Sequence, residues 1–296
     1  MSEVKTWIPQ PTSDGSFTFF SDEFGEAFHS SQGAKEEAFL KFATATRLVE
    51  RSHHPRIALL DVCYGLGYNT AAALETIWAA HPQCHVTVYG LERDASVPVA
   101  ATQPPVVQSW SPQVQTILTE LAIAHRCTTP TLDATLLIGD ARQTIQTVIQ
   151  YHFQADAIFF DPFSPRRCPQ LWTVEFFKKV GQCLAPSGIL ATYSRSASVR
   201  AAMLEAGFTI GTIPMEATAN LPSHEWAQGT VASRTELSLP PLSPMEQEHL
   251  QTRAAIPYRD PTLSDDADAI LARQLHEQQG CQRESTSSWR RRWSIQ

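Results

Sequence analysis

No apolar run in the sequence approaches the roughly 18–20 residues that a helix needs to cross a bilayer. The N-terminus, MSEVKTWIPQPTSDGS, lacks the apolar core of a secretory signal. No two cysteines form a C-x-x-C pair, so we expect neither a disulfide framework nor a zinc site. The six cysteines are Cys63, Cys84, Cys127, Cys168, Cys183 and Cys281. These absences favour a cytoplasmic protein that binds no metal.

Charged residues are also few, and the acidic residues outnumber the basic ones. The chain has 296 residues, of which 43% are hydrophobic and 18% charged, and its net charge is −7. This length and composition predict one large globular domain with an appendage. An acidic balance argues against binding to nucleic acid in general, but binding depends on local basic patches rather than on the sum of charges.

Short apolar runs alternate with helix-like segments from Arg56 onward, which predicts a parallel sheet covered by helices on both faces. The expected strands are 57–63, 85–92, 135–140, 157–161 and 189–194, followed by an antiparallel hairpin near 208–213 and 226–233. The expected helices are 69–80, 141–151, a segment within 171–184, and 199–208. The fold class is therefore α/β, with a mostly parallel, seven-stranded, Rossmann-like sheet. We expect residues 93–134 to form a largely irregular, proline-rich insertion.

Composition divides the chain into three parts. Residues 1–55 form an N-terminal extension with a β-like piece at 16–21 and a helix from about Ala34 to Arg51. Residues 56–234 form the α/β domain. Residues 235–296 begin with the linker LSLPPLSP, contain one convincing helix at 264–279, and are too weakly apolar to fold alone.

A glycine turn follows the first strand of the predicted sheet. In DVCYGLGYN, which runs from Asp61 to Asn69, Gly65 and Gly67 permit a sharp turn and a close approach of a ligand to the backbone. We expect Asp61 and Asn69, at the two ends of this segment, to contact the cofactor as well. A dinucleotide fingerprint would place a third glycine where Thr70 stands, so the pattern for binding a pyrophosphate is incomplete.

Two acidic residues end later strands of the same sheet. Glu92 is placed to bind both hydroxyl groups of a ribose, and Asp140, followed by Ala141, is placed to bind an adenine amino group. Each carboxylate taken alone fits a solvated strand end, and Asp140 before ARQTIQ also fits a helix N-cap. The glycine turn and the two acids on successive strands together resemble the pattern of class I S-adenosylmethionine-dependent methyltransferases.

The fourth strand ends in DAIFFDPFSPRRCPQLW, in which Asp161 lies at the strand tip. The motif Asp-Pro-Phe resembles the Asp-Pro-Pro-Tyr signature of amino methyltransferases, in which a carboxylate accepts a hydrogen bond from the amine. Asp161 suits an acceptor for the amine proton, and Phe163 suits a stacking face for the base. The alternative is an aspartate that caps a turn, beside a phenylalanine that belongs to the core.

The segments taken together resemble the methyltransferase family typified by the methyltransferase domain of MnmC, which acts on the wobble uridine of certain tRNAs. The resemblance covers about Phe19 to Ser233 and rests mainly on FGEAFHSSQGAKEE combined with DPFSPRRCPQLW. It implies methylation of 5-aminomethyluridine, or its 2-thio form, to 5-methylaminomethyluridine. The site residues that it implies are Gly65, Gly67, Glu92, Asp140 and Ala141 for the cofactor, Asp161 and Phe163 for the reaction, and Glu36 with Phe28-His29-Ser30 for the methionine end.

The sequence departs from this family in two ways. Pro162 stands where the common family form has glycine, which we expect to stiffen the loop. Bifunctional members also carry an FAD-dependent oxidase domain, whereas the residues after Arg234 are too few for one and contain no Gly-x-Gly-x-x-Gly. We therefore expect a stand-alone methyltransferase that binds S-adenosylmethionine and no FAD.

A tRNA substrate requires basic residues that contact phosphate. Arg166 and Arg167 are the favoured contacts because they follow the Asp-Pro-Phe motif directly. Further candidates are Lys35, Lys41, Lys178, Lys179 and the run Arg290–Arg292, which Trp289 and Trp293 flank. The alternative for these further candidates is an ordinary solvated surface or a disordered chain end.

Three other functions fit parts of the pattern. One is a class I methyltransferase that acts on a small-molecule amine or on DNA adenine. Another is an aminopropyltransferase similar to spermidine synthase, although that class has more glycine in the turn and further acids for a polyamine. The last is an RNA-binding scaffold, which need not bind S-adenosylmethionine.

Overall fold

The computed structural model describes residues 6–214 and 227–295, and its central element is an eight-stranded sheet. The strands of this sheet are β5 (Arg56–Val62), β6 (His85–Glu92), β7 (Arg126–Thr129), β8 (Leu132–Ile138), β9 (Ala155–Phe160), β10 (Leu184–Thr192), β11 (Thr209–Ile213) and β12 (Gly229–Ser233). Their order is β11-β12-β10-β9-β5-β6-β8-β7. Strands β5, β6, β8, β9 and β10 are parallel, whereas β7 and β12 are antiparallel to their neighbours β8 and β10.

The strand order reverses between β5 and β9. From β5 the chain passes through β6 to β8 on one side, and it then returns to form β9 on the other side of β5. Ligands of open α/β sheets bind outside the carboxyl ends of the strands at such a reversal. The register pairs Val62 with Phe160 at the ends of these two strands. The connections that follow β5 and β9 therefore start side by side.

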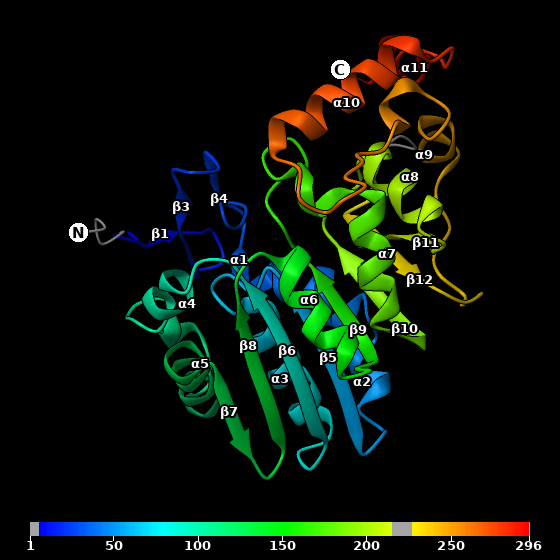
Figure 1. Cartoon of the computed structure of the whole chain (residues 1–296). Coiled ribbons are helices and arrows are strands. Elements are labelled where there is room, and N and C mark those ends of the chain that lie inside the picture. The colour runs from blue at the N-terminus through cyan, green and yellow to red at the C-terminus, as the bar shows by residue number, and fades with distance from the viewer. Residues whose placement is uncertain (1–5, 215–226, 296) are drawn as a thin grey trace.

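Helices cover both faces of the sheet (Figure 1), so the molecule has three layers. The helices of the α/β part are α3 (Tyr68–Ala80), α4 (Ser96–Ala101), α5 (Pro112–Ala124), α6 (Ala141–Gln150), α7 (Val174–Gln182) and α8 (Ala197–Glu205). Helices α3 and α5 pack on one face, and α6, α7 and α8 pack on the other. No helix within residues 6–214 and 227–295 combines the length and apolarity that crossing a membrane requires.

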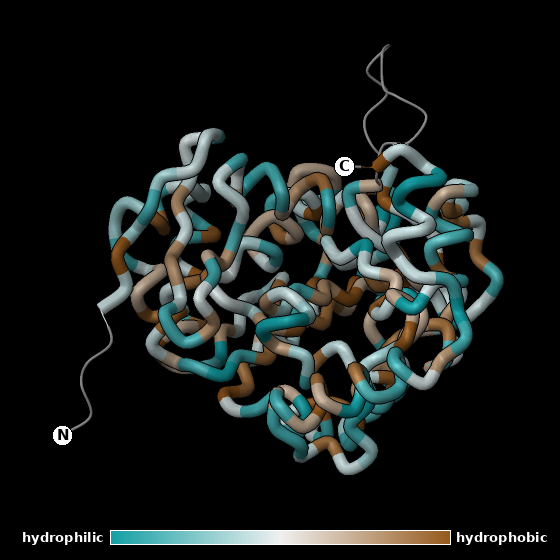
Figure 2. The backbone as a smooth tube through the Cα atoms, turned by 90° about the horizontal axis from the view of Figure 1, so that it is seen from above, coloured by the Kyte–Doolittle hydropathy of each residue, from teal (hydrophilic) through white to brown (hydrophobic). Residues whose placement is uncertain are grey.

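The central strands are apolar on both sides because both faces are covered. Successive residues alternate between the two hydrophobic clusters: Leu59 and Phe159 belong to one, and Leu60 and Phe160 belong to the other. All four side chains are fully buried. Viewed from above (Figure 2), hydrophobic segments accordingly lie in the centre of the molecule.

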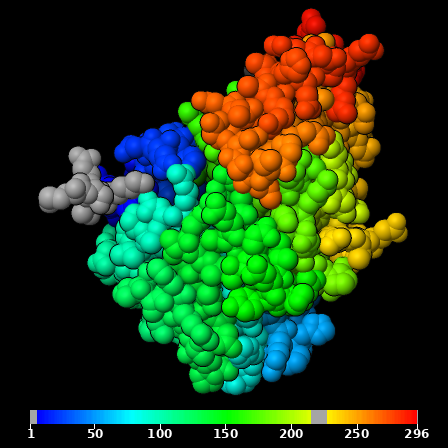
Figure 3. All heavy atoms as spheres, in the orientation of Figure 1, coloured from blue at the N-terminus to red at the C-terminus, as the bar shows by residue number. Residues whose placement is uncertain are grey.

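The two ends of the described chain lie at the same end of the sheet, beyond the carboxyl ends of the parallel strands (Figure 1). The N-terminal elements are β1 (Gln10–Pro11), β2 (Phe17–Thr18), β3 (Phe20–Ser21), β4 (Glu26–Ala27), α1 (Ala34–Glu37), the π-helix η1 (Ala38–Thr44) and α2 (Leu48–Arg51). The C-terminal helices are α9 (Pro244–His249), α10 (Ala267–Gly280) and α11 (Thr286–Arg292). In Figure 3 the N-terminal segment, in blue, lies on one side of this end of the molecule, and the C-terminal segment, in orange, lies on the other.

Several expectations from the sequence are wrong in detail. The segment 93–134 is not irregular, since it contains α4, the 3₁₀ turn η2 (Val107–Ser109), α5 and β7. Strand β7 is the eighth strand of a sheet expected to have seven. The helix expected over 34–51 is divided into α1, η1 and α2, with Arg47 at a φ of 59° before α2.

The described part of the C-terminal tail also has more regular structure than expected, with three α-helices and the 3₁₀ helix η4 (Arg253–Ala255) where one helix was predicted. A buried ion pair attaches it to the core: Arg200 of α8 and Glu246 of α9 lie 2.9 Å apart, with side chains 1% and 2% exposed. Arg200 also donates through Nε to the Thr230 hydroxyl of β12. An unpaired charge at this depth would be strongly unfavourable, so the pair holds the tail against the sheet.

We expect Glu246→Gln to lower the free energy of unfolding by about 3 kcal/mol or more, because it leaves the buried Arg200 without a carboxylate. Glutamine can still complete the capping box of Ser243 at the start of α9, so the substitution isolates the charge. The matched control is Glu205→Gln, which breaks the exposed pair with Arg259 and should cost less than about 1 kcal/mol. Chemical denaturation of the two variants measures the difference, and equal losses would contradict the assigned role of the buried pair.

Candidate active site

A cavity of about 620 Å³ lies beyond the carboxyl ends of the central strands. The residues that follow or end four parallel strands line it: Gly65 after β5, Glu92 at the end of β6, Asp140 after β8 and Asp161 after β9. The structure thus brings together the residues that the sequence places at the strand ends. The cavity lies at the reversal of strand order, where this sheet type binds ligands.

The turn after β5 forms one wall of the cavity, and its geometry requires glycine. Gly65 has a φ of 54°, and a Cβ there would lie 3.3 Å from Cδ1 of Phe28. Gly67 has a φ of 80°, and a Cβ there would lie only 2.6 Å from the Tyr64 hydroxyl. Gly65 lines the cavity, whereas Gly67 precedes α3 and shapes the turn from behind. Gly65 is therefore open to a ligand in the cavity, whereas Gly67 can affect the cavity only through the shape of the turn.

Glu92 is 8% exposed, and backbone N–H groups hold its carboxylate in place. The amide of Gly65 donates to Oε2 and the amide of Asp94 donates to Oε1, each at 2.8 Å. Burial raises the pKa of Glu92, and these hydrogen bonds oppose the rise. Each carboxylate oxygen can accept a second hydrogen bond, so the group retains acceptors for a pair of ligand hydroxyls.

Asp140 both caps α6 and lines the cavity, so the two alternatives that the sequence left open are compatible. Its Oδ1 accepts a hydrogen bond from the Arg142 amide at 2.9 Å. Its Oδ2 accepts another from Nη2 of Arg142 at 2.7 Å. Burial alone would raise the pKa of Asp140, but the contacts with Arg142 outweigh it and keep the pKa below its usual value.

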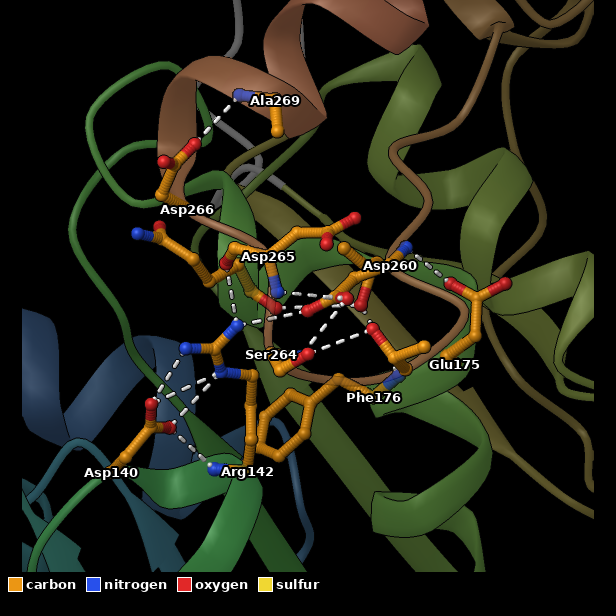
Figure 4. Close-up of polar contacts among 12 residues, drawn as sticks. Asp140, Arg142, Glu175, Phe176, Asp260, Ser264, Asp265, Asp266 and Ala269 are labelled. Atoms are coloured by element: carbon orange, nitrogen blue, oxygen red, sulfur yellow. Dashed lines mark hydrogen bonds and ion pairs between the residues drawn. The ribbon is translucent and has the colours of Figure 1, made fainter.

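Arg142 connects this carboxylate to the C-terminal tail (Figure 4). Its Nη1 donates to Oδ2 of Asp260 and to the carbonyl oxygen of Asp265, both at 2.9 Å. Asp260 is fully buried, and its Oδ1 accepts hydrogen bonds from the amides of Ser264 and Asp265. Residues 264–266 line the cavity, so the tail forms part of its wall.

Asp161 is the carboxylate that the sequence selects for catalysis, and it faces the same cavity. Its side chain is held by Asn69, whose Nδ2 donates to Oδ2 at 2.9 Å. Burial, together with the negative charge of Glu37, raises the pKa of Asp161 to about 8, although the Asn69 hydrogen bond favours the ionised form. The raised pKa brings this carboxyl closer to the range in which amines titrate.

Asp61 and Asn69 were expected to contact a cofactor, and the structure places both beneath the cavity wall rather than in it. Asp61 is completely buried and accepts a hydrogen bond from the Thr70 hydroxyl at 2.7 Å, which ties β5 to α3. Burial raises the pKa of Asp61 to about 7. These two residues therefore support the Gly65 turn and Asp161 without facing the cavity themselves.

The loop after Asp161 is fixed by contacts from several elements. The Phe163 ring stacks on Phe24, with centroids 4.3 Å apart, and meets Phe28 edge-on at 4.9 Å. Nε1 of Trp172 donates to the Phe163 carbonyl oxygen, and the Tyr193 hydroxyl donates to the Pro162 carbonyl oxygen, each at 2.8 Å. Phe163 lines the cavity with both of its aromatic partners, so it is part of the site as well as of the packing.

Glu26 of β4 holds the same loop from the N-terminal side. Its carboxylate accepts hydrogen bonds from both the amide and the hydroxyl of Ser164. The N-terminal hairpin β3–β4 therefore clamps the loop that carries Asp161. No pattern in the sequence indicated this contact, because Glu26 and Ser164 are separated by 138 positions.

Glu36 does not line this cavity, and its expected contact with the methionine end of the cofactor stays a prediction. Glu36 lines a second cavity together with Ser30, whereas Phe28 lines the first. Arg166 and Arg167 are exposed beside the Phe163 loop, as a surface contact requires.

Sequence reasoning missed three contributors to the site: Arg142, Glu26 and the tail segment 264–266. The sequence signal for Arg142 is its position two residues after Asp140, at a helix start from which its side chain donates back to that carboxylate. The tail carries none, since its contact with Arg142 spans 118 positions.

Comparison with known proteins defines the class. Residues 104–218 match the model of a family described as S-adenosyl-L-methionine-dependent methyltransferase. The sheet order agrees with this match, because a glycine turn after β5 and an acid at the end of β6 flank one cavity at the reversal of the strand order. The protein is an S-adenosylmethionine-dependent methyltransferase with the class I α/β fold.

Closer similarities define the family. The structure is similar to that of MnmC2 from Aquifex aeolicus, with 30% sequence identity, a TM-score of 0.80, and coverage of 95% of this chain and 87% of that chain. The chain belongs to the MnmC-like methyltransferase family. It is also 27% identical to the protein MJ0670 of Methanocaldococcus jannaschii over 274 residues, which are 88% of this chain and 69% of that protein.

A further relative is the tRNA 5-methylaminomethyl-2-thiouridine biosynthesis bifunctional protein MnmC of Polaromonas naphthalenivorans. The two sequences are 28% identical over 224 residues, which are 72% of this chain and 34% of that protein. The chain therefore matches about a third of the length of this relative.

The network in Figure 4 predicts that a tail residue affects the affinity for S-adenosylmethionine. Asp260→Asn should raise the Kd for S-adenosylmethionine about tenfold, because Arg142 loses a buried carboxylate and no longer holds Asp140 firmly. Titration calorimetry measures this Kd at a temperature where the variant is folded. Asp268→Asn, on the exposed face of α10, is the control and should leave the Kd unchanged. If Asp260→Asn lowers the melting temperature but leaves the Kd for S-adenosylmethionine at the wild-type value, the role of Asp260 is structural only.

Proposed function

We propose that the protein transfers a methyl group from S-adenosylmethionine to the exocyclic amine of 5-aminomethyluridine, or its 2-thio form, at the wobble position of tRNA. The product is 5-methylaminomethyluridine. The observation that carries the proposal is the position of Asp161, a half-buried carboxylate that faces the cavity beside the Gly65 turn.

The first cavity suits S-adenosylmethionine, which supplies a methyl group on a positively charged sulfur. In this proposal Glu92 accepts hydrogen bonds from the ribose hydroxyls, with both oxygens already oriented by backbone amides. Asp140 and Ala141 contact the adenine, and Arg142 holds Asp140 in position. Gly65 allows the ligand to approach the backbone, because a Cβ at this position would project towards Phe28.

Asp161 orients the amine and takes up its proton. The neutral amine attacks the methyl carbon, so the nitrogen–carbon bond forms as the carbon–sulfur bond breaks and S-adenosylhomocysteine leaves. The nitrogen is then a secondary ammonium group with one proton more than the neutral product. A cationic amine beside Asp161 favours the ionised carboxylate, and a carboxyl whose pKa is raised to about 8 is a better match for an amine than an ordinary aspartate. Phe163, held by Phe24 and Trp172, provides the face on which the base packs.

The choice of tRNA as substrate is supported by the relatives. The name of the Polaromonas naphthalenivorans protein refers to biosynthesis of tRNA 5-methylaminomethyl-2-thiouridine, and its matching segment covers 72% of this chain. The methylated amine in that name is the product that the Asp161 site would form. Membership in a methyltransferase family favours methyl transfer over the aminopropyl transfer considered from the sequence.

Mass spectrometry of nucleosides tests the proposal directly. Purified protein and S-adenosylmethionine are incubated with tRNA that carries 5-aminomethyluridine, and the tRNA is then digested to nucleosides. We expect the 5-aminomethyluridine peak to be replaced by a nucleoside that is heavier by one methyl group. Matched reactions contain tRNA with unmodified uridine, a DNA duplex with adenine, or free 5-aminomethyluridine. Methylation of DNA, or no methylation of the modified tRNA, would refute the substrate assignment.

A further inference from the structure

A second cavity, of about 910 Å³, lies on the same end of the molecule. Four separate segments line it: the N-terminal segment 30–41, the connection between β10 and α8, residues 227–228 before β12, and the C-terminal tail. The residues used below are Glu37, Lys41, Tyr193, Arg195, His249 and Arg290. Its volume lies within the range of about 300–1,000 Å³ that is common for ligand sites.

The second cavity adjoins the Asp161 carboxylate. Tyr193 lines this cavity, and its hydroxyl donates to the carbonyl oxygen of Pro162, the residue directly after Asp161. The charges of Glu37 and Lys41, which also line it, act on Asp161. A group bound in this cavity would therefore lie near Asp161, which faces the first cavity.

The second cavity carries charges of both signs. Lys41, Arg195 and Arg290 contribute positive charge, and Glu37 forms an ion pair with Lys41. His249 is neutral near pH 7, because burial and the positive charges of Arg200 and Arg290 lower its pKa to about 4. A ligand with a cationic amine and an anionic phosphate matches this distribution, since the carboxylates lie on the N-terminal helices and the arginines on other elements.

The tail arginines differ from one another in their surroundings. Arg290 lines the second cavity. Arg292 lies outside it and forms ion pairs with Glu248 and Glu284. Trp289 is 1% exposed and stacks on His249 at 4.2 Å, so its ring is not available to stack on a base. Only part of the basic run is therefore suited to contact a ligand in this cavity.

We propose that the second cavity binds the sugar and backbone phosphate of the amine-bearing nucleotide of the RNA substrate, with the phosphate against Arg195 and Arg290. The base then extends past Tyr193 towards Phe163, and its amine is directed towards Asp161. This inference rests on the proposed function, and it adds the position of the nucleotide and the residues that bind the phosphate. According to this proposal, the C-terminal helix α11, which carries Arg290, is part of the RNA-binding surface.

Arg290→Ala tests this proposal. Its KM for tRNA carrying 5-aminomethyluridine should rise about tenfold or more, because a charged hydrogen bond to phosphate is lost. The slope of log KM against log salt concentration should fall in magnitude by about 1. The KM for the free nucleoside, which has no phosphate, and the Kd for S-adenosylmethionine should remain at wild-type values.

Arg291→Ala is the matched control, since Arg291 is exposed on the same helix but does not line the cavity. Equal increases in KM for the two variants, or an equal effect of Arg290→Ala on tRNA and on the free nucleoside, would overturn the proposal. Fluorescence anisotropy measures the binding of tRNA directly. It distinguishes a failure of the phosphate site from a failure of the proposed function. A wild-type protein that binds but does not methylate the tRNA refutes the proposed function, whereas wild-type affinity in Arg290→Ala refutes only the phosphate site.

Discussion

The site depends on one constraint, which is that a carboxylate must be held at the tip of a buried strand without losing the ability to ionise. Burial around Asp161 favours its neutral form and raises its pKa to about 8. The Asn69 hydrogen bond acts in the opposite direction and fixes the orientation of the carboxylate. Asn69 is itself positioned by the start of α3, which Gly67 makes possible. In the proposed reaction, this balance suits the exchange of a proton between Asp161 and an amine.

Both ends of the chain are needed to build this environment. The N-terminal hairpin contributes Glu26, which binds Ser164, and Phe24, which stacks on Phe163. The tail contributes Asp260, which anchors Arg142 on the opposite wall of the same cavity. The pair of Arg200 and Glu246 secures the tail to the sheet at a second point. The extensions are thus structural parts of the site, although neither supplies a strand of the central sheet.

The strand tips could be predicted from the sequence because each buried strand is a short apolar run that ends in a polar residue. Topology then places Gly65, Glu92, Asp140 and Asp161 at one edge. Helix α5 was also predictable, since Ser111 and Pro112 mark a helix start and apolar residues recur at helical spacing through Leu121. Strand β7 has only four residues and carries no such signal.

The contacts made by the extensions could not be predicted in the same way. The bond between Arg142 and Asp260 joins positions 118 apart, and the bond between Ser164 and Glu26 joins positions 138 apart. Local propensity and periodicity describe neighbours in the chain, and they contain no information on such pairs. The sequence also carries no signal that Glu36 lines the second cavity, because its position depends on how α1 packs on η1 and α3.

The central claim is that Asp161 accepts the proton of the reacting amine, and the rate of methyl transfer by Asp161→Asn tests it most directly. Asparagine preserves the size of the side chain and can still accept a hydrogen bond, but it cannot take up a proton. In single-turnover reactions the variant should be about 10²–10⁴-fold slower than the wild type, with an unchanged Kd for S-adenosylmethionine. Methyl transfer at the wild-type rate would contradict this account.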